Sequence, residues 1–132
     1  MKERIIPKRK IEGICAILLP FTESGAVDWD AFCAHVGGTA EAGIMPAINM
    51  DTGYANLIDE ETRVDVLRRT QQTLSGGAFT AGAFVRDQAG ASFDAQACYS
   101  QIELIQSFGG TPIICQSFGL TSLSPDELIN AY

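Results

Sequence analysis

The sequence predicts an α/β protein made of four successive strand–helix units, the first half of a (β/α)₈ barrel. Short apolar runs at residues 14–19, 47–50, 81–85 and 112–115 recur with centres roughly 31 to 35 residues apart. Between these runs, apolar residues follow a helical spacing instead. Strands that alternate with helices over short connections form a parallel sheet with right-handed crossovers. The runs are continuously apolar, as in strands covered on both faces.

Each predicted helix has a start signal and an apolar face. Asp28, Asp59 and Asp94 can each accept a hydrogen bond from the first turn of the helix that follows. Three faces are predicted from the spacing: Trp29, Phe32, Cys33, Val36 and Ala40; then Val64, Leu67, Thr70, Gln71 and Leu74; then Cys98, Ile102, Ile105 and Phe108. A fourth helix is predicted from about residue 125, because Ser124 and Glu127 form a capping box around Pro125.

Glycines mark the end of the first three predicted helices. Gly43, Gly76 and Gly109 each stand just before a predicted strand. Glycine supplies the left-handed residue at which a helix commonly ends. The same punctuation at a regular interval favours repeated units of one barrel.

A small doubly wound sheet with an interaction role is the alternative architecture. Its nucleotide-binding form requires a G-x-G-x-x-G loop after the first strand. Residues 19–25 read Leu-Pro-Phe-Thr-Glu-Ser-Gly and contain one glycine. The segment is therefore no phosphate-binding loop, and the equal spacing favours the barrel.

Charge divides the chain into a basic arm, residues 1–12, and an acidic body, residues 13–132. Five of the nine Lys and Arg residues lie within the first ten positions, although the net charge of the protein is −7. An acidic body disfavours a nucleic-acid surface, which needs basic residues on the fold itself. No apolar run approaches the ~20 residues that span a bilayer. We therefore expect no nucleic-acid partner, no membrane span and a cytoplasmic protein.

Cysteine and histidine usage argues against a metal site. The four cysteines are widely spaced, without a C-x-x-C pair, and His35 is the only histidine. A zinc site needs closely grouped Cys and His ligands. We interpret the cysteines as small buried thiols in a reducing compartment, and we expect neither a metal nor an organic cofactor.

Functional residues of parallel α/β folds gather where the strands end. Several segments of the sequence resemble, in order along the chain, the dihydrodipicolinate synthase and N-acetylneuraminate lyase family. They are Ile17-Leu18-Leu19-Pro20-Phe21, Ser24-Gly25-Ala26-Val27-Asp28, Glu41-Ala42-Gly43-Ile44, and Asp51-Thr52-Gly53-Tyr54 ahead of Asp59-Glu60-Glu61-Thr62-Arg63. The resemblance covers nearly the whole chain after the basic arm.

This resemblance implies a (β/α)₈ barrel, often oligomeric, that acts as a class I aldolase. Such a lyase binds pyruvate or a related 2-oxo acid as a Schiff base on a lysine. The family's Gly-Thr-Thr-Gly-Glu turn corresponds here to Met50-Asp51-Thr52-Gly53-Tyr54. Thr52 and Gly53 match, so the Thr52 hydroxyl and neighbouring backbone N–H groups are candidates for binding the substrate carboxylate. Asp51 replaces a threonine, and an ionised carboxylate cannot donate a proton and repels an anion.

Asp51 and Thr52 are therefore the candidate catalytic residues, under one of three conditions. Asp51 is protonated in the working site, or the substrate differs from pyruvate, or the site has lost this chemistry. The candidate substrate-binding residues are Thr52, Gly53, Tyr54, Arg86, Gln116 and Ser117, which all follow predicted strands. Ordinary structural roles compete with each: a glycine turn, a surface tyrosine, a solvated loop arginine and a polar loop.

Two further departures concern the chemistry. Leu120 falls in the segment where the family carries a tyrosine pair, so the family's tyrosine relay does not carry over. All three lysines, Lys2, Lys8 and Lys10, lie in the basic arm, whereas the family's Schiff-base lysine belongs to a sixth strand. We therefore expect this chain to be inactive alone. A non-catalytic barrel paralogue or small-acid-binding module remains the alternative function.

Overall fold

The computed structural model describes residues 10–131, which form a four-stranded parallel sheet with helices packed against it. The strands are β1 (Ile14–Ala16), β2 (Met45–Ile48), β3 (Thr80–Ala83) and β4 (Thr111–Ile114). They pair in the order β1-β2-β3-β4, and every pair is parallel. A doubly wound sheet would reverse its strand order at an internal switch point. The consecutive order confirms the predicted (β/α)₈ type and shows that the doubly wound alternative is wrong.

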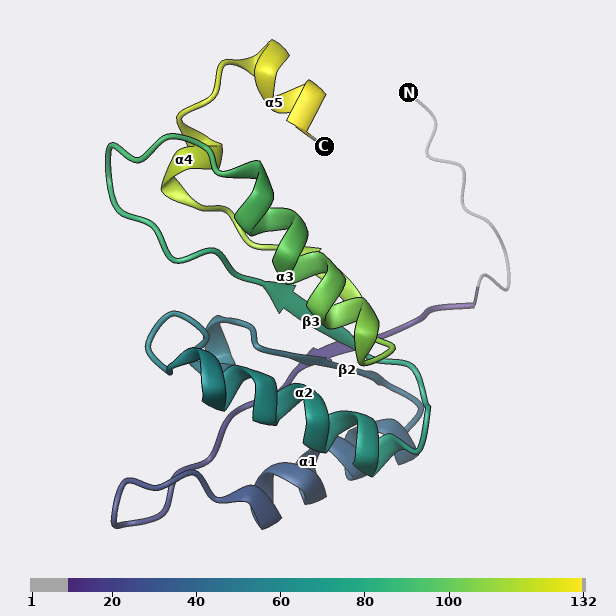
Figure 1. The fold of residues 1–132 in the computed structure, drawn as a ribbon. Coiled ribbons are helices and arrows are strands. Elements are labelled where there is room, and N and C mark those ends of the chain that lie inside the picture. The colour runs from purple at the N-terminus through teal and green to yellow at the C-terminus, as the bar shows by residue number, and fades with distance from the viewer. Residues whose placement is uncertain (1–9, 132) are drawn as a thin grey trace.

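The long helices follow the strands in sequence. They are α1 (Trp29–Glu41), α2 (Glu60–Leu74) and α3 (Ala95–Ser107), and Figure 1 shows α1 beside α2 and α3 beside β3. A 3₁₀ turn, η1 (Asp51–Gly53), precedes α2. Two short helices, α4 (Phe118–Thr121) and α5 (Pro125–Ala131), follow β4. The predicted fourth helix is α5, and α4 was not predicted.

The helix starts and ends follow the predicted local signals. Asp28, Asp59 and Asp94 accept hydrogen bonds from Ala31, Thr62 and Ala97 N–H at 3.0, 2.7 and 2.9 Å. Ser124 and Glu127 form the predicted capping box. Gly43, Gly76 and Gly109 have φ of 77°, 89° and 79°, so all three helix ends are confirmed.

The core lies between the sheet and the helices. Its buried side chains include Ile17 and Leu19 after β1, Phe32 and Val36 of α1, Leu67 of α2 and Ile105 of α3. The Arg69 guanidinium lies 4.3 Å from the centre of the Trp29 ring and joins α2 to α1. The helices cover this core. Ile14 and Leu18 of the first unit lie outside it and are 58% and 54% exposed.

The observed strand limits and the buried face of one helix differ from the predicted ones. The strand ladder ends at Ala16 rather than at residue 19, because β2 stops at Ile48 and Asn49 adopts a left-handed backbone with φ 51°. On α2 the buried residues are Arg63, Val66, Leu67 and Thr70, while the predicted Gln71 is exposed. Arg63 takes a core position because its aliphatic stem can be buried while its charged end reaches polar partners.

The predicted arm lies largely outside the described residues. Lys10 and Glu12 form an ion pair of 3.2 Å in which both side chains are exposed. The division at residue 12 stays a prediction.

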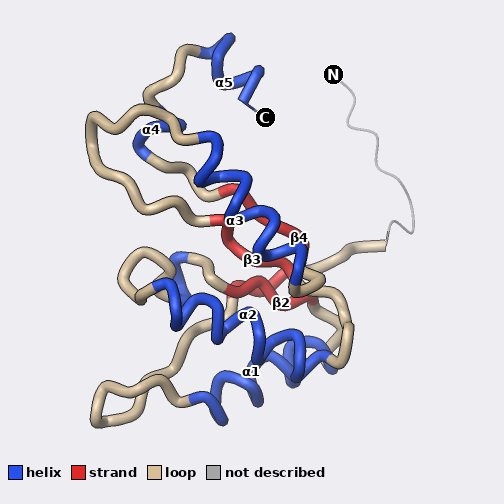
Figure 2. Tube along the Cα trace, viewed as in Figure 1, coloured by secondary structure: helices blue, strands red, loops and turns tan. Residues whose placement is uncertain are grey.

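Figure 2 shows the strands together at the centre of the fold, with long loops at one end.

Candidate functional site at the carboxyl ends of the strands

The loops that follow β1, β2 and β3 lie on one side of the molecule, on the left in Figure 1. This side holds the carboxyl ends of the strands, where parallel α/β folds place their ligands. Gly82 of β3 is the point of closest approach: a Cβ there would collide with the Asn49 carbonyl oxygen and lie 3.1 Å from the Cys115 Sγ. The ends of β2, β3 and β4 are thereby packed against one another.

The centre of this edge is the turn Asp51-Thr52-Gly53, bracketed by two residues in the left-handed region. Asn49 has φ 51° and Tyr54 has φ 57°. This conformation costs an ordinary side chain about 1–2 kcal/mol, and such outliers cluster at functional sites. The buried Asn49 compensates through its side chain, whose Nδ2 donates to the Arg63 carbonyl at 3.1 Å. Tyr54 has no comparable local compensation among the described residues.

The backbone N–H groups of Thr52, Gly53 and Tyr54 already have partners. The N–H groups of Gly53 and Tyr54 donate to the carbonyls of Met50 and Asp51 at 3.0 and 2.9 Å. The Thr52 N–H donates to the Asp51 carboxylate at 2.9 Å. The Thr52 side chain is exposed, and its hydroxyl has no hydrogen-bond partner within residues 10–131. The Thr52 hydroxyl is therefore a free donor of the turn, and displacement of the Asp51 carboxylate would free the Thr52 N–H as another donor.

Two aromatic rings stand beside this turn. The Phe21 and Tyr54 ring centres are 5.8 Å apart with an interplanar angle of 58°, and the side chains are 45% and 40% exposed. Phe21 follows β1 and is held by an antiparallel bridge to Val27. Sequence patterns gave no signal for this pair, because it joins residues of two different units.

Cys115, at the end of β4, faces the same edge. Burial raises the pKa of the Cys115 thiol, and the Asp51 carboxylate raises it further. A thiol with a raised pKa remains protonated near neutral pH and is a poor nucleophile. Cys115 therefore contributes a small apolar surface beside Asp51.

The other predicted residues are dispersed. Gln116 is exposed, and the Ser117 hydroxyl caps α4 by accepting from the Leu120 N–H at 3.1 Å. Arg86 does not join the Thr52 turn through any hydrogen bond; its guanidinium donates to the Ile58 carbonyl at 2.8 Å. The structure thus brings Asp51, Thr52, Gly53 and Tyr54 together and places Arg86 in a second location.

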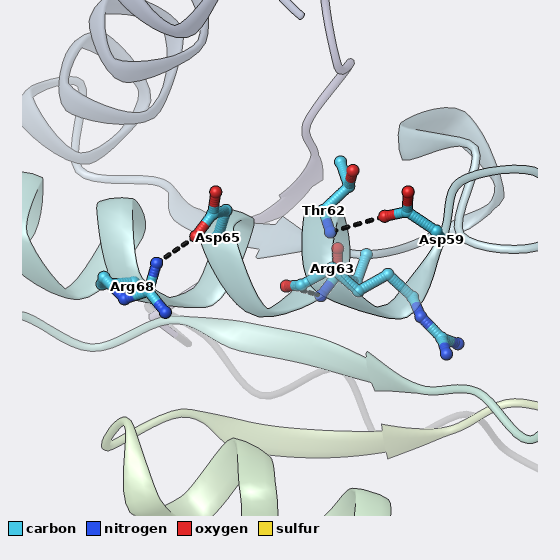
Figure 3. Close-up of polar contacts among 6 residues, drawn as sticks. Asp59, Thr62, Arg63, Asp65 and Arg68 are labelled. Atoms are coloured by element: carbon cyan, nitrogen blue, oxygen red, sulfur yellow. Dashed lines mark hydrogen bonds and ion pairs between the residues drawn. The ribbon is translucent and has the colours of Figure 1, made fainter.

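That second location is an open cleft of about 320 Å³ between the amino-terminal halves of α2 and α3. Arg63 and Arg86 line it together with Glu60. Arg63 donates to the Phe84 carbonyl at 3.3 Å and lies over the Phe84 ring. Figure 3 shows the Arg63 guanidinium pointing away from the Asp65–Arg68 ion pair of the same helix. Burial lowers the pKa of Arg63, although Glu60 opposes this shift.

The fold and this edge define a class: four parallel strand–helix units with a polar turn where the second strand ends. Among solved structures, the chain is similar to a proposed dihydrodipicolinate synthetase from Pseudomonas aeruginosa, with a TM-score of 0.73, 16% identity and coverage of 92% of this chain and 41% of the other. It is also similar to the 4-hydroxy-tetrahydrodipicolinate synthase from the thermoacidophilic methanotroph Methylacidiphilum fumariolicum SolV, with a TM-score of 0.63, 17% identity and coverage of 80% and 34%.

A third similar structure is KD(P)GA from T. tenax, with a TM-score of 0.54, 13% identity and coverage of 92% of this chain and 43% of the other. No protein-family model and no curated protein matches the sequence. The chain spans about two fifths of the first structure. At these identities the comparisons show the fold, and the predicted resemblance to the dihydrodipicolinate synthase and N-acetylneuraminate lyase family is confirmed at that level.

Residues 10–131 contain no group of three His, Cys, Asp or Glu side chains placed to share a metal ion. Within the same residues, no helix combines the length and the apolar character needed to cross a bilayer.

Proposed function

We propose that this chain is the amino-terminal half of a lyase barrel that acts on a 2-oxo acid, with the Asp51–Gly53 turn facing the substrate carboxylate. The observation that carries the proposal is this turn's position at the carboxyl end of β2, between two left-handed residues and with an exposed Thr52 hydroxyl. A hydroxyl and a backbone N–H are suitable donors for a carboxylate.

Asp51 has a definite part in this proposal. Its carboxylate accepts a hydrogen bond from the Thr52 N–H at 2.9 Å, and a substrate carboxylate would use the same donor. We infer that an incoming acid displaces the Asp51 side chain, so that Thr52 then offers both its N–H and its hydroxyl. Displacement costs binding free energy, because a held donor must be released and two anions approach each other.

The test is a titration of the 132-residue chain with pyruvate, in which binding is monitored by amide chemical shifts. Shifts should centre on Thr52 and Gly53. Asp51→Ala should tighten binding about fivefold by removing the competing carboxylate, and Thr52→Val should weaken it about fivefold. Thr111→Val, at the opposite end of the sheet, is the matched control and should leave binding unchanged. Pyruvate that causes no shift in this turn would contradict the proposal.

The chemical step requires a lysine that the described barrel units do not contain. In the proposed reaction, an amine attacks the 2-oxo carbon and water leaves, giving an iminium that borohydride reduces. Borohydride with pyruvate should leave the 132-residue chain without a turn-associated adduct, whereas a longer protein carrying downstream strands should gain one there. The absence of an adduct in that longer protein would favour the small-acid-binding module. Asp51 and Leu120, which differ from the family's catalytic pattern, are consistent with that alternative.

The remaining parts of the proposal concern the setting of the protein. We infer a cytoplasmic homo-oligomer that uses neither metal nor organic cofactor. The four unpaired cysteines support a reducing compartment. The acidic body supports a small-molecule substrate over nucleic acid.

A further inference from the structure

Tyr54 occupies a backbone position that its side chain does not favour. Its φ of 57° and ψ of 31° lie in the left-handed region, where glycine and asparagine are the usual residues. The Tyr54 carbonyl accepts from the N–H groups of Leu57 and Ile58 at 2.8 and 3.0 Å, so the backbone shape is needed locally. The tyrosine ring is not needed for that shape, and it remains 40% exposed.

Phe21 meets Tyr54 from the neighbouring unit and is also held in place. Its loop is closed by hydrogen bonds from Thr22 N–H to the Ala26 carbonyl at 2.8 Å and from Asp28 N–H to the Pro20 carbonyl at 2.9 Å. Asp28 in turn caps α1. Both rings therefore sit on fixed backbone, and their tilted arrangement leaves aromatic surface open to solvent. Fixed, exposed and adjacent aromatic rings are a common feature of ligand sites.

The two rings lie within reach of a molecule bound at Thr52. Residues two positions apart have Cα atoms at most about 7 Å apart, so Tyr54 and Thr52 fall within the length of one small ligand. The Asp51 carboxylate accepts from the Thr52 N–H within the turn, whereas the Tyr54 ring meets that of Phe21, which follows β1. Polar groups and an aromatic pair thus adjoin at this turn.

We propose that Phe21 and Tyr54 are specificity-determining residues that hold an aromatic group, and that the substrate class is the aromatic 2-oxo acids. This inference rests on the proposed function, because Thr52 must orient the acid end. The aromatic ring of the substrate packs on the Phe21–Tyr54 face while its carboxylate lies at the turn. Pyruvate itself would leave this face uncovered.

The test compares phenylpyruvate with pyruvate on the full 132-residue chain, by saturation-transfer NMR and by amide shifts. We expect phenylpyruvate to bind about tenfold more tightly. Tyr54→Asn removes the ring and keeps a residue suited to the left-handed backbone, so the chain should remain folded. Tyr54→Asn and Phe21→Ala should each abolish the preference for phenylpyruvate over pyruvate. Tyr99→Asn, on the exposed face of α3, is the matched control and should retain the preference.

Each outcome separates this inference from the proposed function. Equal affinity for the two acids would overturn the aromatic face while leaving the acid site standing. Failure of pyruvate to bind would overturn the proposed function, and phenylpyruvate binding that survives Thr52→Val and depends on Tyr54 would then show a plain aromatic site. A change in sedimentation of the ligand-free chain on Tyr54→Asn would identify the rings as a contact between copies and overturn the substrate role.

Discussion

At the scale of single residues, this protein concentrates unusual geometry at one edge of the sheet. Asn49 and Tyr54 take left-handed backbone conformations, and Gly82 passes so close to Asn49 that no side chain fits. These three positions fix where the Asp51–Gly53 turn lies relative to β3. The turn is therefore set by close contacts between units as well as by its own sequence.

Gly82→Ala tests this packing. The added Cβ would collide with the Asn49 carbonyl and press on Cys115, and relief requires movement of the β2 or β4 end. We expect a loss of about 1–3 kcal/mol in unfolding free energy by urea denaturation. Gly38→Ala is the control, since a Cβ there meets nothing within 4 Å on α1, and it should stabilise the chain by up to about 1 kcal/mol. Equal effects at both positions would refute the close-packing argument.

At the scale of elements, polar links join each unit to the next. Arg63 of α2 donates to the Phe84 carbonyl after β3, while Arg86 of that loop donates back to the Ile58 carbonyl before α2. One unit later, the Asp87 carboxylate accepts from the N–H groups of Phe118 and Gly119 at 3.0 and 2.7 Å. Asp87 thereby fixes the start of α4 against the preceding loop.

The Asp87 link predicts a pH dependence. Hydrogen bonds from the Gly119 and then the Phe118 N–H lower the Asp87 pKa below its ordinary 3.8 in the folded chain. A carboxyl with a lower pKa when folded contributes stability above its unfolded pKa, and that contribution is lost as pH falls through the folded pKa. Urea midpoints of the unmodified chain should thus fall more steeply between roughly pH 5 and 3 than those of Asp87→Asn. Glu23→Gln, in an exposed loop, should follow the unmodified chain; a parallel profile for Asp87→Asn would refute the link.

At the scale of the whole molecule, the described sheet has two open edges, at β1 and at β4. β1 and β4 each pair with one neighbour, and Ile14 and Leu18 stand more than half exposed. Parallel strands with free edges and exposed apolar side chains promote pairing with further strands. The chain spans 41% and 34% of the first two similar structures.

The 132-residue chain should therefore associate when prepared alone. Analytical ultracentrifugation is expected to show concentration-dependent dimers or larger species, because association covers the free edges and the exposed apolar side chains beside them. Leu18→Lys, just past the β1 edge strand, should shift the distribution toward monomer, while Leu57→Lys, at an exposed position in the turn before α2, should not. A stable, soluble monomer at every concentration would count against this prediction.

Local patterns along the chain were sufficient to predict the repeated units. Capping aspartates, glycine helix ends and apolar runs act over a few residues, so Asp28, Gly43 and the capping box at Ser124 could be assigned without coordinates. The same patterns misplaced strand ends by one to three residues and missed α4. Strand ends depend on where the neighbouring strand stops, and α4 depends on Asp87, which lies far from it in sequence.

The sequence by itself determined the fold class, the order of the units and the place of the Asp51–Gly53 turn directly after the second strand. Only the tertiary structure decided that Arg63 is buried, that Arg86 turns to the α2–α3 cleft, and that Phe21 meets Tyr54. It also decided that Asp51 holds the Thr52 N–H. The physical reason is the distance along the chain over which each interaction acts. Helix propensities and caps depend on neighbouring residues, whereas these arrangements depend on contacts between separate units, which also set the shape of the turn.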